Sequence, residues 1–404
     1  MKNQPPQPET PSAVPHSGDH AVPFWFQLFS LTFIRTFMYT GHRLVFPFLP
    51  VIARGLGVNL GMVALAVSIR SGLGIFSPLL GRLSDQKGRK AAMLIGLLLF
   101  SVSSLIIAFL PTYSAFLIGL SLIWVGVIIF DPAIQAYVGE RVAFERRARA
   151  IAILEFGWSG AFLIGIPLVG ILLARGRWND PFLWLAGLGG LGTVFIWKTI
   201  PKIKENGGQR FRLLDGLQHV VSHPPAVGGL LVSLLLVMAN QAVLIIYGAW
   251  LENTHKMTPK MLGRVSSVIG VAGIVGLVAV VAISDKVGKR RAIAAGILLN
   301  VAAAVSLTVF TGSVATVVAL LFVFFLSFEF SFVTGISLIT ELRPRARATM
   351  MAFNTAAISL GDAFGAFVGS RVYTGDITAN VLLTVVLNLV VFVVLISLVH
   401  VEYS

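Results

Sequence analysis

The chain has 404 residues, of which 56% are hydrophobic and only 12% are charged. A soluble globular domain carries about 25% charged residues, so this composition excludes a soluble protein and indicates a polytopic membrane protein. The chain contains no cysteine, which excludes disulfides, thiolate catalysis and cysteine-bound metals.

The formal net charge of +14 would suit a nucleic-acid-binding protein, but the positions of the charges argue against one. Twenty of the 31 lysines and arginines lie in five alternate loops, and the loops between these hold seven. Such an excess in alternate loops marks the cytoplasmic side of a membrane protein. It predicts a multi-pass protein of the cytoplasmic (inner) membrane, surrounded by lipid, with both termini in the cytoplasm and no nucleic-acid partner.

Residues 1–22 are rich in proline and lack an apolar run, so we expect a disordered cytoplasmic tail there rather than a signal peptide. Twelve apolar segments follow, and crossing a bilayer takes about 20 residues. The most polar interior stretch, 201–225, is predicted to be a cytoplasmic linker between an N-terminal six-helix bundle (23–200) and a C-terminal one (226–404). The predicted spans are 24–53, 60–80, 91–110, 114–138, 149–173, 181–200, 226–252, 262–283, 292–311, 315–340, 349–372 and 379–399.

A short charged sequence recurs at matching places in the two halves. After the second span the chain reads Gly81-Arg82-Leu83-Ser84-Asp85-Gln86-Lys87-Gly88-Arg89-Lys90, and after the eighth it reads Ser284-Asp285-Lys286-Val287-Gly288-Lys289-Arg290. A second repeat opens the fifth and eleventh spans, where Arg147-Ala148-Arg149-Ala150 matches Arg345-Ala346-Arg347-Ala348. Each follows an acid, Glu140 or Glu341. Repeats of this kind predict a duplicated helical bundle.

The first charged sequence resembles the loop that follows the second helix in the major facilitator superfamily, and the second resembles the weaker copy after the eighth. The resemblance covers about residues 24–400. It implies an all-α membrane protein with twelve transmembrane helices in two pseudo-symmetric bundles, a monomer that moves a small molecule without a cofactor. In that family the loop fastens the cytoplasmic ends of the bundles together. The residues it assigns to this gating motif are Gly81, Asp85, Gly88, Arg89, Lys90, Glu140, Asp285, Gly288 and Arg290.

Two further motifs concern the direction and the coupling of transport. The fifth span reads Gly165-Ile166-Pro167-Leu168-Val169-Gly170, which is similar to the G-P-x-x-G core of the antiporter branch except for one residue inserted before the proline. This resemblance implies proton-coupled efflux of drugs, sugars or other amphipathic compounds. In the fourth span, however, Leu120 stands where drug antiporters usually carry an arginine. Uptake or symport of an anionic solute, and a receptor or scaffold that does not transport, are therefore alternatives.

Polar and charged residues at membrane depth usually face a cavity or a partner, because burying them in lipid costs several kcal/mol. We expect the substrate and proton pathway among them. Arg35, Tyr39 and His42 share one face of the first span through their i, i+4, i+7 spacing. Structural roles are the alternative: Arg70 and Asp131 would form a salt bridge within the first half, and Glu155 would contact loops near the cytoplasmic end of its helix. Arg43 is expected to extend toward the outer headgroups. The candidates are Arg35, Tyr39, His42, Arg70, Asp131, Glu155, Asn240, Gln241, Glu329 and Asp362.

Proton coupling would need a cavity acid whose surroundings change as access alternates. We expect Asp131 to fill this role first, because movement away from Arg70 would change its proton affinity, and then Glu329 and Asp362. The sequence shows no Ser-His-Asp order, nucleotide loop or metal-ligand cluster, and His219 and His223 would need a third ligand to hold a metal. We therefore expect neither an enzyme nor a metal site.

Overall fold

The computed structural model describes residues 22–142, 144–201, 223–343 and 347–399. Throughout this part of the chain the regular structure is helical, with no strand. The predicted tail and most of the predicted linker lie outside the described residues. Within them the predicted all-α architecture is confirmed. Eleven of the crossings are long and apolar enough to span a membrane.

The first crossing is the exception. It consists of α1 (Phe24–Arg43) and α2 (Val45–Leu56), which bends at Phe48, where the backbone leaves helical geometry between two prolines. Arg35, His42 and Arg43 make α1 too polar to count as a membrane span by composition alone. A helix that carries so many polar groups must bury them inside the bundle.

The other crossings follow in chain order, and most predicted limits agree with the helix ends within a few residues. The seventh crossing, like the first, consists of two consecutive helices, and the fifth changes helix type in its middle. The elements are α3 (Leu60–Gly72), η1 (Leu73–Phe76), α4 (Ser77–Lys87), α5 (Arg89–Phe109), α6 (Tyr113–Arg141), α7 (Phe144–Gly160), η2 (Ala161–Gly165), α8 (Ile166–Leu173), α9 (Asp180–Thr199), α11 (Pro224–Leu244), α12 (Tyr247–His255), α13 (Pro259–Ala279), η3 (Val280–Ser284), α14 (Asp285–Val287), α15 (Lys289–Val309), α16 (Val314–Leu342), α17 (Arg347–Val372) and α18 (Thr378–Ser397).

The inserted residue of the fifth span lies at a local change of helix type. η2 is a π-helical turn that ends at Gly165, and Pro167 then occupies the first turn of α8. Proline lacks an N–H and fits a first helical turn, where that N–H would have no helical partner. A π-turn is wider than an α-turn. The fifth crossing thus accommodates the extra residue without leaving helical structure.

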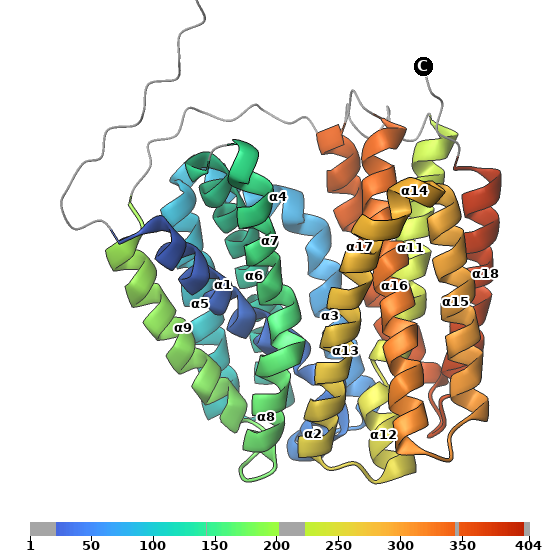
Figure 1. Ribbon diagram of the computed structural model, residues 1–404. Coiled ribbons are helices and arrows are strands. Elements are labelled where there is room, and N and C mark those ends of the chain that lie inside the picture. Colours follow the sequence, from blue (N-terminus) through green and yellow to red (C-terminus); the bar gives the residue numbers. More distant parts are fainter. Residues whose placement is uncertain (1–21, 143, 202–222, 344–346, 400–404) are drawn as a thin grey trace, which may run out of the picture.

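The two halves form two bundles, one from α1 to α9 and one from α11 to α18 (Figure 1). We call the end of the molecule that carries α4 and α14 the hinge end, and the other, which carries α2, α8 and α12, the far end (Figure 1). α1 begins and α18 ends at the hinge end, as an even number of crossings requires.

The halves pack closely at the far end. A Cβ on Gly248 of α12 would lie 2.2 Å from the carbonyl oxygen of Pro47 in α2, and one on Gly263 of α13 would lie 3.0 Å from the Cα of Pro167. Glycine therefore lets the backbones of the two halves meet. Arg54 of α2 also bonds Glu252 of α12, with Nη1 and Oε1 2.5 Å apart.

Candidate functional site

A buried arginine forms the centre of the N-terminal bundle. The guanidinium of Arg35, on α1, makes a bidentate ion pair with Asp131 of α6: Nε lies 2.9 Å from Oδ1 and Nη2 lies 3.0 Å from Oδ2. Tyr39, one turn further along α1, donates its hydroxyl to Asp131 Oδ2 at 2.5 Å. Arg35 is only 3% exposed. The predicted common face of Arg35 and Tyr39 is thus the face that holds Asp131.

The fifth crossing completes the surroundings of Arg35. Its Nη1 donates to the carbonyl oxygen of Leu154 at 2.7 Å and lies 3.0 Å from the carboxylate of Glu155. The approach is possible because a Cβ on Gly157 would lie 2.9 Å from the Cβ of Arg35. Glu155 thus pairs with a residue of the predicted pathway, while its side chain is 42% exposed.

Arg70 does not pair with Asp131, so the predicted partnership is wrong. Arg70 is fully buried on α3, and its Nη1 donates to the carbonyl oxygen of His42, while the carboxylate of Asp131 is already engaged by Arg35. The Nε and Nη2 atoms of Arg70 are buried without a hydrogen-bond partner in the described part of the chain. The ring of His42 stacks on Trp124 of α6, with centroids 4.1 Å apart. His42 therefore shares the face of Arg35 but not its ion pair.

Arg43 was expected to extend toward the headgroups, and this expectation is also wrong. Its guanidinium lies over the ring of Trp158, 4.2 Å from the centroid, and over Phe162 at 5.1 Å. Such a cation–π contact stabilises a charge away from water. Two acids of the C-terminal bundle, Glu329 and Asp362, lie within electrostatic range of Arg43. Sequence reasoning left Arg43 out of the site. The aromatic residues of the fifth span, four positions apart, were the signal that could have included it.

The two acids of the C-terminal bundle lie on α16 and α17. α6 and α16 both have 29 residues, and Asp131 and Glu329 occupy positions three residues apart in them. Asp362 lies within electrostatic range of Arg70 as well as Arg43. Ser359, one turn before Asp362, faces Gly74 of the second crossing, where an added Cβ would lie 2.1 Å from its Oγ. Asp362 thus faces the N-terminal bundle.

The predicted polar pair of the seventh span lies elsewhere in the same bundle. Asn240 and Gln241 are buried on α11, and Gln241 packs against α17 at Gly365. Asn240 Oδ1 and Gln241 Nε2 have no hydrogen-bond partner among the described residues. The structure places neither in contact with Asp131 or Arg35, so the pair stays a separate candidate.

The two hinge loops have the same design. Gly88 and Gly288 have φ of +93° and +91°, which side chains other than glycine rarely adopt. Arg89 bonds Glu140 at the end of α6, with Nη2 and Oε1 3.0 Å apart, and Lys289 pairs with Glu341 at the end of α16.

The next residue of each loop binds the last crossing of its own half. Lys90 donates to the carbonyl oxygen of Trp197 on α9 at 2.7 Å, and Arg290 donates to those of Leu395 and Ile396 on α18. Cations there satisfy the free carbonyls of a helix end. Gly81 and Asp85 lie on α4 and Asp285 begins α14. Each of the bonds described here lies within one bundle.

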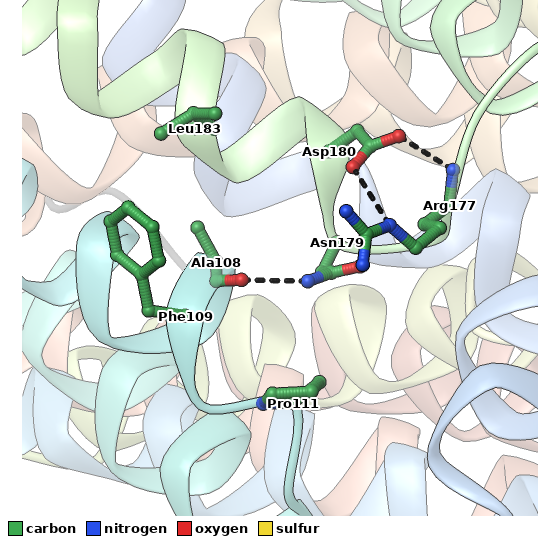
Figure 2. Close-up of a pocket in the computed structure, with 7 residues that line it drawn as sticks. All are labelled: Ala108, Phe109, Pro111, Arg177, Asn179, Asp180 and Leu183. Carbon is green, nitrogen blue, oxygen red and sulfur yellow. Dashed lines mark hydrogen bonds and ion pairs between the residues drawn. The ribbon is translucent and has the colours of Figure 1, made fainter.

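A surface pocket of about 210 Å³ lies at the far end of the N-terminal bundle, between the end of α5 and the start of α9 (Figure 2). Its polar groups are already paired: Asn179 donates to the carbonyl oxygen of Ala108 at 2.7 Å, and the backbone N–H of Arg177 donates to Asp180 at 2.6 Å. None of the predicted site residues lines it. The pocket is a consequence of how two loops pack, and the interior charges are the better candidate site.

Comparisons with known proteins agree with this architecture. The chain is 24% identical over 332 residues to the uncharacterized MFS-type transporter YceJ of Bacillus subtilis, covering 82% of this chain and 85% of that protein. It is 24% identical over 310 residues to multidrug resistance protein 2 of the same organism, covering 74% and 76%. A bacterial homolog of the human lysosomal transporter Spinster, solved in an inward-facing and occupied conformation, superimposes with a TM-score of 0.75 at 13% identity, over 92% of this chain and 96% of that one.

The decisive match is to a family model. The model described as Major Facilitator Superfamily matches residues 31–366 and 230–404. Together with the two bundles and the paired hinge loops, this match shows that the chain belongs to the Major Facilitator Superfamily of membrane transporters.

Proposed function

We propose that this protein exports small amphipathic molecules across the cytoplasmic membrane by alternating access, in exchange for protons. The observation that carries the proposal is the charge arrangement between the bundles. Arg43 and Arg70 belong to the N-terminal bundle, and the acids in electrostatic range of them, Glu329 and Asp362, belong to the C-terminal bundle. A rocking movement of one bundle against the other changes these distances.

The packing of the halves supports alternating access. The bundles meet at the far end through Gly248, Gly263 and the Arg54–Glu252 pair, whereas the Arg89–Glu140 and Lys289–Glu341 ion pairs at the hinge end each lie within one half. The positive charge of the hinge loops favours the cytoplasmic side for the hinge end. The described conformation would then be closed toward the outside, which is consistent with its similarity to an inward-facing structure.

The geometry also changes which acid we propose for proton coupling. Asp131 and its partner Arg35 belong to the same bundle, so a rigid rocking movement leaves their ion pair intact. Glu329 and Asp362 face cations of the other bundle and accept no hydrogen bond from a residue that the structure describes. We therefore infer that Asp362 and Glu329, rather than Asp131, carry the exchanged proton.

Efflux rests on two similarities. The chain is similar in sequence to multidrug resistance protein 2 over 76% of that protein's length, and the fifth span keeps the Pro-x-x-Gly part of the antiporter motif. The alternative of anion uptake loses part of its basis, because Asp131, Glu155 and a carbonyl oxygen already occupy Arg35. Leu120 is a buried apolar residue where other antiporters carry an arginine, so the acids would work with Arg43 and Arg70 instead.

A flux measurement tests the proposal. A hypersensitive bacterial host that expresses the protein is first screened on a panel of toxic amphipathic compounds, and a protected compound is then followed in proteoliposomes with and without an imposed pH gradient. We expect gradient-driven flux for the wild type, and little response to the gradient for Asp362→Asn and Glu329→Gln. Asp180→Asn, in the surface pocket, is the control and should behave as the wild type. Binding without flux would indicate a receptor, and flux that ignores the gradient in the wild type would refute proton exchange.

A further inference from the structure

The interior carries a set of hydrogen-bond donors without acceptors. Arg70 Nε and Nη2, Arg43 Nε and Trp124 Nε1 are all buried and have no hydrogen-bond partner in the described ranges. They come from three crossings of the N-terminal bundle. A buried donor that lacks an acceptor costs about 1–3 kcal/mol, and more when it is charged. Such a cluster suits a ligand that supplies acceptor oxygens.

These donors lie near one another. Arg70 binds the carbonyl oxygen of His42, the residue before Arg43, and the ring of His42 stacks on Trp124. Trp124 Nε1 and Ser359 Oγ both lie within 3.5 Å of the position that a Cβ on Gly74 would occupy. The donor cluster therefore faces α17 at the boundary between the bundles, where Asp362 follows Ser359 by one turn.

The opposite side of the boundary has the complementary chemistry. The carboxylates of Glu329 and Asp362 receive no hydrogen bond from any residue the structure describes, and both residues are partly exposed rather than fully buried. Arg43 lies over the faces of Trp158 and Phe162 and within electrostatic range of both acids, and these rings also suit the aromatic part of a ligand. One bundle thus offers donors and the other offers acceptors.

Charge balance decides which ligand fits. Arg35 is matched by the buried Asp131, and the additional acid, Glu155, has a side chain that is 42% exposed, so water balances its charge. This leaves the two cations Arg43 and Arg70 facing the two acids Glu329 and Asp362. A ligand with a net charge would leave one charge unmatched at membrane depth, which is costly. A ligand that carries one charge of each sign leaves the balance unchanged and meets partners on both sides.

On the basis of the proposed function, we infer that the substrates are zwitterionic aromatic compounds. Their anionic group binds Arg70 and Trp124 of the N-terminal bundle, and their ammonium group binds Glu329 and Asp362 of the C-terminal bundle. A substrate held in this way bridges the two bundles, and neither of its charged groups alone makes both sets of contacts.

The test uses four ligands that share one ring system: para-aminomethylbenzoic acid, its methyl ester, its N-acetyl derivative and the N-acetyl methyl ester, together with the biphenyl homologues of all four. Their affinities are measured for the full-length protein in detergent by calorimetry, so the measurement does not require transport. We expect the zwitterion of at least one ring length to bind about tenfold or more tightly than its ester and its N-acetyl derivative, since a charge-assisted contact is worth at least a factor of ten.

Two variants assign each charged group of the ligand to one side. In Arg70→Gln the loss of affinity caused by esterification should disappear, while the loss caused by N-acetylation persists. Glu329→Gln should show the reverse. Trp124→Phe keeps the aromatic stack on His42, removes one donor and should reduce the effect of esterification alone. If Arg70→Gln does not fold, Trp124→Phe tests the binding site of the anionic group in its place. Arg177→Gln, 85% exposed at the far end of the N-terminal bundle, is the matched control and should preserve both preferences.

A zwitterion that binds no more tightly than its singly charged relatives at either ring length would overturn the inference. The inference would also be overturned if each variant reduced the effects of esterification and of N-acetylation on affinity by equal amounts. The proposed function is tested separately. If the affinities follow the expected pattern but no flux occurs in proteoliposomes, transport is contradicted and the ligand class is still supported.

Discussion

The Arg35–Asp131 pair gives the most quantitative prediction. Arg35 is 3% exposed, makes two hydrogen bonds to Asp131, one to a backbone carbonyl oxygen and an ion pair with Glu155. Removing one partner of a buried pair leaves an unmatched charge and costs about 3–5 kcal/mol. We therefore expect Arg35→Gln and Asp131→Asn each to lower the free energy of unfolding by roughly this amount.

The double variant distinguishes pairing from general disruption. Replacing a whole buried pair by apolar residues of similar volume is often close to neutral, so Arg35→Met with Asp131→Leu should cost clearly less than the sum of the two single changes. The assay is reversible unfolding by SDS titration in mixed micelles. Arg54→Gln breaks an exposed pair at the far end, where Arg54 is 62% exposed, and should cost about 1 kcal/mol or less. The reasoning would be refuted if the single changes at Arg35 and Asp131 lowered the free energy of unfolding no more than this control does, and if their effects were additive in the double variant.

Four further predictions concern packing, the hinges and a loop. Gly165→Ala would place a Cβ 1.8 Å from Thr40 Oγ1 and should cost about 1–3 kcal/mol of unfolding free energy, whereas Gly187→Ala, with no atom within 4 Å, should be neutral. Gly88→Ala and Gly288→Ala should each cost about 1–3 kcal/mol, because their φ is positive, and Gly72→Ala should not; equal stability would contradict the strain. Glu140→Gln releases Arg89 and should change the ratio of the two access states by about fivefold at most, with unchanged ligand affinity, as measured by spin-label distances. The side-chain hydrogen bond from Thr378, together with weaker backbone ones, lowers the pKa of Asp376, so the small contribution of Asp376 to stability is present above about pH 4 and is lost as the pH falls through the lowered pKa; Thr378→Ala should reduce this pH dependence of the unfolding curve.

The sequence was sufficient for the fold because apolar length and repeated motifs are local signals. Twelve segments, a polar interval between two halves and two copies of a charged loop depend on residues close together in the chain. Gly88 and Gly288 show this well, since a glycine in a short charged loop predicts a turn, and both adopt nearly the same positive φ. Glu140 and Arg89 both belong to the gating motif identified from the sequence, and the structure shows that they pair with each other.

Pairings between distant helices could not be predicted in this way. Arg35 and Arg70 lie on adjacent crossings, but Arg70 binds the carbonyl oxygen of His42, two turns along α1 from Arg35. The relative depth and rotation of α1 and α3 therefore decide which arginine meets Asp131. The position of Arg43 depends on the fifth crossing, where glycines bring α7 and η2 against α1 and so bring Trp158 to its guanidinium. Helix rotation and close approach are tertiary properties that periodicity does not determine.

The central claim, that the two bundles open alternately, can be measured as two distances in one protein. The chain contains no cysteine, so pairs of cysteines can be introduced for spin labelling without first removing others. One pair joins Ala152 on α7 to Ala282 in η3, both exposed on the hinge half of the molecule, and the other joins Arg175 to Thr254, both exposed at the far end. Alternating access predicts that a transported ligand, or a change of pH, shifts the two distance distributions in opposite directions. Distributions that stay fixed, or that widen together, would contradict it.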